Sequence, residues 1–183
     1  LHFSYAEIKE IIGARSVGPS STAFIETVSV DSRRIFSGEN TLFFALPGEF
    51  RNGEDFVEQA YSQGVRLFVV RNDILATNFP DAQFLIVENV LIALQELAAY
   101  HRRQFNYPVI GITGSAGKTT VKEWLYQLLS TSFSVIRSPK SYNSQLGVAL
   151  SLLEMTDTHE IALIEAGISE PGEMKRLAEM IQP

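Results

Sequence analysis

Apolar and polar positions in the first half of the chain change repeatedly between helical and strand-like spacing. A capping box at Ser4–Glu7, followed by apolar residues three and four apart, predicts a helix that ends at Gly13. The Ser-, Pro- and Gly-rich stretch 15–23 is typical of a loop, and a second helical pattern ends at Gly64. Short apolar runs predict strands at 24–30, 41–46, 66–70 and 84–87. Residues 1–87 are therefore expected to form a small α/β domain.

The second half of the chain has the regular alternation that a parallel sheet requires. Asn89 can cap a long helix that ends near Arg103. Apolar runs then predict strands at 109–112, 133–136 and 161–164, and helical periodicity follows Lys118, Gln145 and Ser169. Strands alternating with helices indicate a doubly wound, mostly parallel sheet, so residues 88–183 are expected to belong to a second α/β domain.

This second domain is expected to continue beyond the chain. After Lys118 there is room for only about two further strand–helix units, whereas doubly wound nucleotide-binding sheets usually have about five or six strands. We therefore expect Pro183 to lie inside a domain of a longer protein.

Composition and charge exclude several classes of protein. The 183 residues are 45% hydrophobic and 20% charged, as in an ordinary soluble globular protein. A net charge of −6 argues against a nucleic-acid partner, and the lack of cysteine excludes disulfides and thiolate metal sites. No stretch approaches the ~20 apolar residues of a membrane span, and the N-terminus does not resemble a signal peptide. We expect a cytoplasmic protein without membrane insertion, whose scattered histidines form no zinc site.

A glycine-rich turn between a predicted strand and a predicted helix is the strongest chemical signal in the chain. Gly114 and Gly117 permit backbone angles that turn successive N–H groups inward, and the following helix start adds partial positive charge. Lys118 would contact the outer phosphates of a nucleotide, and the Thr119 hydroxyl would hold Mg²⁺. The common phosphate-loop spacing requires glycine where this chain has Ile112. The alternative is a plain turn. The predicted ATP-binding residues are Gly114, Ser115, Ala116, Gly117, Lys118, Thr119 and Thr120.

Glu165 follows the apolar run 161–164, at the carboxyl end of a predicted parallel strand. Ligands of such sheets bind at this edge, so Glu165 is predicted to hold the Mg²⁺ that Thr119 also contacts. The alternative is a strand-terminal glutamate that caps the next turn.

Three further polar clusters follow predicted strands. In the segment 140–147, Asn143 or Ser144 is best explained as a helix cap in a solvated loop. Ser32 and Arg33 follow a strand of the first domain, and the segment 48–53 follows the next one. These two clusters are either plain turns or a site for a diphosphate and a base.

Together these segments resemble the Mur ligases, ATP-dependent enzymes of peptidoglycan precursor synthesis. The glycine spacing G-x-x-G-x-x-G-K-T-T from Gly111 to Thr120 is similar to the phosphate loop of that family, and it accounts for the residue at position 112. The run Asp31-Ser32-Arg33, the stretch 42–48 and Asn52-Gly53 resemble its UDP-binding N-terminal domain. The patch 143–147 and the run 165–167 are similar to the next two motifs of its central ATPase domain.

Within the family, the motifs are most similar to the ligases that join D-Ala-D-Ala to UDP-MurNAc-tripeptide. Segments at 122–127, 138–143 and 165–169 resemble a bacterial form fused to an alanine racemase. Pyridoxal phosphate would be a cofactor only if such a racemase domain follows. The resemblance implies two domains, a UDP-precursor-binding domain at 1–87 and the first part of an ATP-binding domain at 88–183.

The resemblance also implies a reaction and a set of site residues. ATP and Mg²⁺ would activate the tripeptide carboxylate as an acyl phosphate, which the amine of D-Ala-D-Ala then attacks. Lys118 and Glu165 would be catalytic, with Thr119 and Glu165 at the metal. Residues implied to bind the UDP-MurNAc-peptide are Ser32, Arg33, Gly48, Glu49, Phe50, Arg51, Asn143 and Ser144.

Alternative functions are another ligase of the same superfamily, with a UDP-MurNAc-dipeptide or folate substrate, a P-loop kinase or other NTPase, and a non-catalytic nucleotide-binding module. A kinase or GTPase would favour glycine at position 112, and a folate-type ligase would lack a UDP-binding first domain. Because the family's later catalytic residues and C-terminal domain are not in this chain, we expect the chain alone not to ligate.

Overall fold

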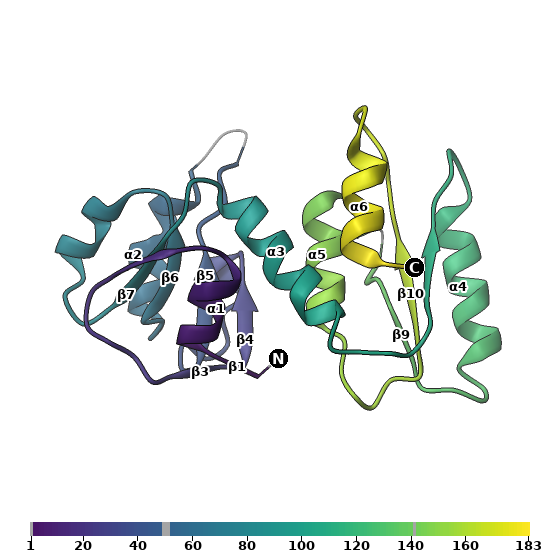
Figure 1. Ribbon diagram of the computed structural model, residues 1–183, viewed down its shortest axis with the longest axis horizontal. Helices are drawn as coiled ribbons and strands as arrows, with labels where there is room; N and C mark the ends of the chain where they lie inside the picture. Colours follow the sequence, from purple (N-terminus) through teal and green to yellow (C-terminus); the bar gives the residue numbers. More distant parts are fainter. Residues whose placement is uncertain (1, 49–51, 141) are drawn as a thin grey trace. The chain divides into compact units, whose positions relative to one another are not determined.

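The computed structural model describes residues 2–48, 52–140 and 142–183, and it divides into two compact units, Leu1–Leu94 and Gln95–Pro183 (Figure 1). The division falls inside helix α3 (Val90–Arg102), so one continuous helix belongs to both units. The assignment of residues 1–87 and 88–183 to a UDP-binding and an ATP-binding domain stays a prediction. In the described part of the chain, no helix is both long enough and apolar enough to cross a membrane.

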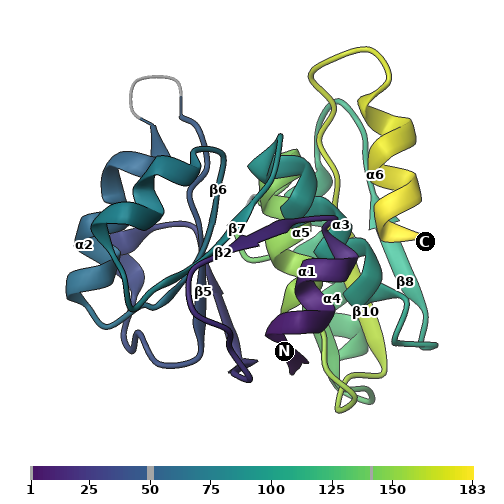
Figure 2. The ribbon, with the colours of Figure 1, turned by 60° about the vertical axis from the view of Figure 1, so that its left-hand side comes forward.

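The first unit is built on a five-stranded sheet with the order β2-β7-β6-β5-β4. Strands β4 to β7 run parallel, and β2 pairs antiparallel with β7 at one edge. Figure 2 shows helix α2 on one face of this sheet and α1 on the other. The sheet strands are β2 (Arg15–Val17), β4 (Thr27–Ser29), β5 (Thr41–Phe44), β6 (Leu67–Val70) and β7 (Gln83–Ile86). The remaining elements are the antiparallel pair β1 (Phe3–Ser4) and β3 (Phe24–Ile25), helices α1 (Tyr5–Ile11) and α2 (Val57–Ser62), and the 3₁₀ helices η1 (Ser32–Arg34), η2 (Gly53–Phe56) and η3 (Asp73–Asn78).

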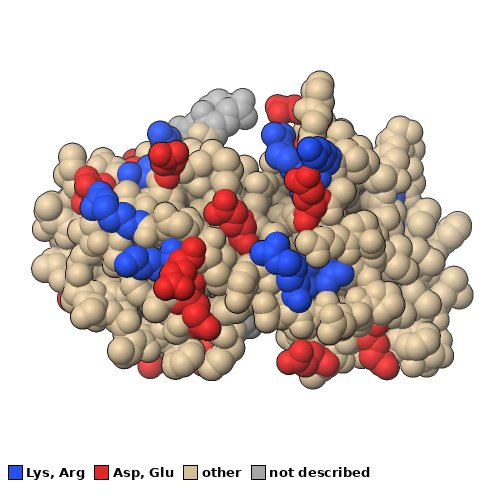
Figure 3. All heavy atoms as spheres, viewed as in Figure 1, with Lys and Arg blue, Asp and Glu red and all other residues tan. Residues whose placement is uncertain are grey.

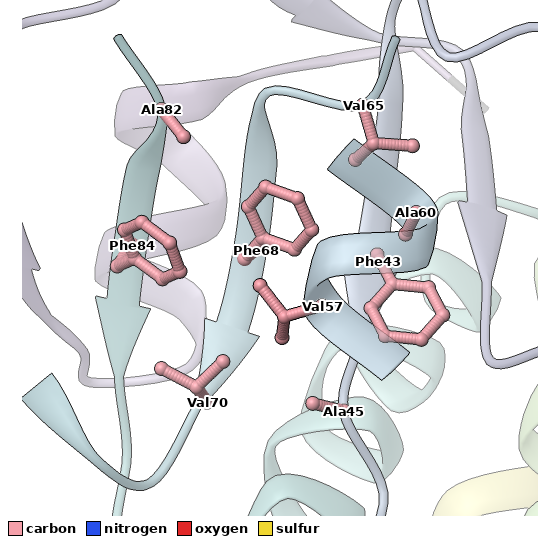
Figure 4. Close-up of a cluster of buried hydrophobic side chains, with 9 residues drawn as sticks. All are labelled: Phe43, Ala45, Val57, Ala60, Val65, Phe68, Val70, Ala82 and Phe84. Atoms are coloured by element: carbon pink, nitrogen blue, oxygen red, sulfur yellow. The ribbon is translucent and has the colours of Figure 1, made fainter. Parts of the chain in front are cut away.

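A row of phenylalanines forms the core on the α2 side of this sheet. The register pairs Phe43 with Phe68 and Phe68 with Phe84, so the three rings lie side by side on adjacent strands (Figure 4). The ring centroids of Phe68 and Phe84 are 5.1 Å apart in a stacked arrangement. Val57 and Ala60 of α2 complete the cluster, so the amphipathic helix and the parallel register together exclude water from this face.

Two details of the first unit differ from the sequence prediction. The stretch 15–23, expected to be a loop, contains strand β2, because three residues pair with the edge of β7. The predicted strand 24–30 is divided at Glu26, where the N–H groups of Glu26 and Thr27 both donate to the carbonyl of Asn40. Short edge strands depend on a distant partner, so local sequence identifies them poorly.

The second unit contains a parallel sheet with β10 between two neighbours, in the order β8-β10-β9. Helix α4 covers one face, and α5 and α6 lie on the other (Figure 1). This arrangement confirms the predicted α/β class with helices on both sides of a parallel sheet. The elements are β8 (Val109–Ile112), α4 (Lys118–Leu129), β9 (Val135–Arg137), α5 (Gln145–Leu153), β10 (Ile161–Glu165) and α6 (Glu173–Ile181).

Helix α4 exposes several of the apolar residues whose helical spacing predicts it in the sequence. Val121, Trp124 and Leu128 are 46%, 65% and 71% exposed, although they lie on one helical face. The face that meets the sheet instead carries Lys122, which is buried in the middle of the helix. The apolar periodicity therefore identified the helix correctly but did not identify the side that contacts the sheet.

Charged side chains of both signs are interspersed over the face that Figure 3 shows. Neither sign forms a continuous field on this face, in agreement with the modest net charge of −6. On this face, any attraction for a phosphate group would have to come from local donors rather than from a broad basic surface.

Replacement of Phe68 by alanine should destabilise the first unit by about 3–5 kcal/mol, because the ring is fully buried between two other aromatic rings. Amide hydrogen exchange of β5, β6 and β7 in increasing urea would measure the loss for this unit separately.

Phe36→Ala is the matched control, because Phe36 is 103% exposed. It should change the free energy of unfolding by less than about 0.5 kcal/mol. Equal losses in the two variants would contradict the packing described above.

Candidate functional site

The register of the second sheet places Glu165 beside the start of the glycine-rich loop. Glu165 is the last residue of β10 and pairs with Ile112, the last residue of β8. The N–H of the next residue, Ala166, donates to the carbonyl of Ile112 at 2.9 Å. Parallel pairing therefore brings the Glu165 carboxylate to the start of a loop that lies far from it in the sequence.

The loop between β8 and α4 has the backbone shape that the glycines predict. Gly114 has φ 147° and Gly117 has φ 78°, both in the region that favours glycine, which confirms that expectation. Gly117 is the N-cap of α4 and has no side chain with which to cap the helix, so the first N–H groups of α4 suit an anion. The Nζ of Lys118 donates to the carbonyl of Gly114 at 2.8 Å, which folds this lysine back over the loop.

Donors from two other segments surround the buried carboxylate of Glu165. The Thr119 hydroxyl donates to Oε1 at 3.0 Å and to Oε2 at 2.9 Å. The Asn143 amide donates to Oε1 at 2.9 Å, and the Lys122 Nζ lies 3.1 Å from Oε2. The Ser138 hydroxyl also accepts from the backbone N–H of Glu165 at 3.1 Å. The carboxylate is thus held by α4 on one side and by the segment between β9 and α5 on the other.

These contacts set the charge state of the site. Burial raises the pKa of Glu165, but the hydrogen bonds from Asn143, Lys122 and Thr119, with the positive charge of Lys122, outweigh burial and hold the pKa below its usual value. Glu165 is therefore an anion at neutral pH.

Sequence reasoning missed Lys122 as a member of this site. Its spacing offers a signal, because Lys122 lies three residues after Thr119 and four after Lys118, so it lies on the same side of α4 as these residues. The burial of this lysine against a carboxylate is revealed only by the packing of α4 on β10.

Asn143 and Ser144 have structural contacts of their own. Ser144 is the N-cap of α5, and its hydroxyl accepts from the N–H of Gly147 at 3.2 Å, which confirms the predicted cap. The carbonyl of Asn143 accepts from the N–H of Gly167 at 2.7 Å, next to the carboxylate that its amide contacts. Their role toward a substrate stays a prediction. Ser115, Ala116 and Thr120 are exposed along the loop and the helix start.

In the first unit, two of the residues predicted to bind UDP, Ser32 and Arg33, lie in the turn η1. The Ser32 hydroxyl is buried and donates to Gln59 Oε1 at 2.8 Å. Arg33 is exposed and donates to both carboxylate oxygens of Asp31, at 2.9 and 2.8 Å. The Arg33 guanidinium is the main reason why the pKa of Asp31 falls to about 2. Gly48 is exposed, whereas Glu49, Phe50 and Arg51 lie outside the described residues.

The oxygen atoms of Thr119 and Glu165 suit a hard cation such as Mg²⁺. Among the residues that the structure describes, no group of three or more His, Cys, Asp or Glu side chains could hold a metal ion. A cation here would need further oxygen ligands, which phosphates and water commonly supply to Mg²⁺. The strand, loop, helix and carboxylate together have the arrangement expected of a phosphate-loop nucleotide site.

Sequence comparison identifies the family to which this site belongs. Residues 112–183 match the family model described as Mur ligase middle domain. A UDP-N-acetylmuramoyl-tripeptide–D-alanyl-D-alanine ligase of Synechocystis sp. is 37% identical over 159 residues, which are 87% of this chain and 34% of that protein. The ligase of the same name in Haemophilus influenzae is 33% identical over an alignment of 187 positions, which covers 100% of this chain and 40% of that protein.

Solved structures agree with the sequence matches. MurF from Acinetobacter baumannii superposes with a TM-score of 0.89 at 30% identity, over 100% of this chain and 40% of that one. MurF ligase from Thermotoga maritima, in complex with ADP, gives a TM-score of 0.74 at 30% identity, over 85% of this chain and 35% of that one. Residues 112–183 belong to the Mur ligase middle-domain family, and the chain as a whole is similar to these ligases. It spans between 34% and 40% of the length of these relatives.

Replacement of Glu165 by glutamine should lower the stability of the second unit at neutral pH, and the difference from the unmodified chain should shrink in acid. A carboxyl group whose pKa is lowered by folding stabilises the fold above its unfolded value, here 4.5, and loses this contribution as the pH falls through the folded value. Urea unfolding of both proteins from neutral pH to below 4.5 would measure the difference.

Glu154→Gln is a control of opposite sign, because burial raises the pKa of Glu154. In that comparison the unmodified chain should gain stability relative to the variant as the pH falls. If the difference in unfolding free energy between Glu165→Gln and the unmodified chain stays constant as the pH falls, the assigned ion pair is contradicted.

Proposed function

We propose that the protein containing this chain is an ATP-dependent amide ligase that joins D-Ala-D-Ala to UDP-MurNAc-tripeptide. The observation that carries the proposal is the contact of Thr119 with both oxygens of Glu165, directly beside the loop that presents Lys118. The names of the Synechocystis and Haemophilus relatives supply the substrates, and the ADP complex of the Thermotoga relative supports nucleotide binding. Because the cytoplasm supplies ATP, we place the reaction there.

The residues of the second unit divide the work of bringing two anions together. The N–H groups at the start of α4 and the ammonium of Lys118 hold the phosphates, once Lys118 leaves the carbonyl of Gly114. Thr119 and Glu165 would hold Mg²⁺, which offsets phosphate charge when it is bound. These groups lower the repulsion between the γ-phosphate and the substrate carboxylate, so that an acyl phosphate can form before the amine of D-Ala-D-Ala displaces phosphate.

The first unit would bind the UDP portion of the substrate. Arg33 has two N–H groups engaged with Asp31 but is exposed, so it can turn toward a diphosphate without losing a buried contact. Ser32 supports the turn through Gln59, and the loop that includes Gly48 would supply backbone N–H groups. Asn143 and Ser144 would contact the sugar end of the substrate.

The proposed reaction is tested in a protein of the full length of the relatives. With UDP-MurNAc-tripeptide, D-Ala-D-Ala, ATP and Mg²⁺ it should release ADP and phosphate and form the pentapeptide, measured by mass spectrometry. Lys118→Ala should lower kcat/KM by about 100-fold or more, because a preorganised cation at the phosphates is lost.

Lys175→Ala is the matched control, because Lys175 is exposed on α6 and pairs only weakly with Glu179 at 3.8 Å. It should leave the rate unchanged.

The chain 1–183 alone should bind Mg·ADP but form no amide. Turnover of the substrates without D-Ala-D-Ala incorporation would refute the proposed reaction.

Arg33→Ala should weaken the binding of UDP to the chain by about tenfold, corresponding to the loss of about 1.4 kcal/mol from one charged contact. Arg15→Ala is the comparison, since Arg15 is also exposed in the first unit and pairs with one aspartate, Asp73. Calorimetric titration with UDP gives both constants. Equal dissociation constants would remove Arg33 from the proposed site.

A further inference from the structure

Lys122 is a cation that the packing of the second unit buries completely. Its side chain has no exposed surface, and its Nζ lies 3.1 Å from Oε2 of Glu165. The same Nζ donates to the carbonyl of Lys140, a residue with φ 49°. Glu123 is also within 3.7 Å, but it pairs more closely with Arg137, at 2.8 Å. The charge of Lys122 is therefore balanced mainly by Glu165.

Two lysines one helical turn apart in α4 consequently have different roles. Lys118 is partly exposed and folds over the glycine-rich loop, where a phosphate would lie. The Nζ of Lys122 is engaged with Glu165 and with the carbonyl of Lys140, and no part of its side chain reaches the surface. Its effect on a ligand has to act through the carboxylate of Glu165.

The donors around Glu165 are arranged on two sides. Asn143 contacts Oε1 and Lys122 contacts Oε2, while Thr119 contacts both oxygens. A carboxylate offers about four lone-pair sites. Lys122 and Asn143 each occupy one, and the Thr119 hydroxyl donates to both oxygens, so a cation bound by Glu165 would lie on the side of Thr119, in place of that hydrogen bond.

We propose that Lys122 is a positioning residue that supplies the counter-charge of Glu165 while no divalent cation is bound. The buried carboxylate then stays aligned beside Thr119 without a metal. The same ammonium repels a free divalent cation, so the site accepts one only together with the anionic phosphates of a nucleotide. This inference rests on the proposal that Glu165 is a cation ligand.

The test is the thermal unfolding of the chain with Lys122→Met, with and without millimolar Mn²⁺ and in the absence of nucleotide. The variant should melt about 10 °C lower, because a buried carboxylate loses its partner. Mn²⁺ should then raise its melting temperature by several degrees, because the cation replaces the missing charge. The unmodified chain and the control Lys175→Met should respond to Mn²⁺ by less than about 1 °C.

A second variant keeps the test decisive if Lys122→Met alone fails to fold. The double variant Lys122→Met/Glu165→Gln removes both charges, so it should melt higher than Lys122→Met and show no response to Mn²⁺. A double variant no more stable than Lys122→Met would overturn the proposal. An equal response of Lys122→Met and the unmodified chain to Mn²⁺ would overturn it as well.

Binding of Mg·ADP to the unmodified chain tests the proposed function separately. If the chain binds no Mg·ADP but its variants follow the expected melting pattern, the nucleotide site is refuted. The pairing of Lys122 with Glu165 is then still supported. A chain that binds Mg·ADP, with variants that do not follow this pattern, would refute the role of Lys122 alone.

Discussion

The carboxylate of Glu165 is the constraint on which the second unit depends. A buried carboxylate is costly unless donors surround it, and these donors come from α4 and from the segment between β9 and α5. The helix that carries Thr119 and Lys122 must therefore lie against the end of β10, and Asn143 must turn toward the same point. The requirement to satisfy one charge fixes the relative positions of the loop, the helix and the central strand.

The first unit is held together in a different way. Its parallel register aligns Phe43, Phe68 and Phe84 under α2, so apolar burial rather than a charge determines the packing. Ser32 and Arg33, which are proposed to bind UDP, lie in the turn η1 after β4, where Arg33 and Asp31 pair. Such turns can change their contacts without disturbing the core, which suits a site that must admit and release a ligand.

Much of the fold and part of the site could be predicted from the sequence. Apart from β2, the strands of both sheets and the helices α3 to α5 follow from local periodicity and caps, because these signals depend on neighbouring residues. The unusual backbone angles at Gly114 and Gly117 were predicted for the same reason. Strand β2 and the division at Glu26 were not, since each depends on a partner far along the chain. The exposed apolar face of α4 likewise differed from the pattern that predicted the helix.

By itself the sequence determined the phosphate-loop spacing, the order of strands and helices, and the presence of Glu165 at the end of a strand. These features depend on residues that are close together in the sequence, so they can be recognised without the tertiary structure. Only the tertiary structure decided that Lys122, Asn143 and Thr119 meet on that one carboxylate. The pairing of Glu165 with Ile112 and the rotation of α4 against β10 produce that meeting, and both are long-range packing choices. The glycine-rich loop thus followed from the sequence, whereas the buried counter-charge beside it followed from the fold.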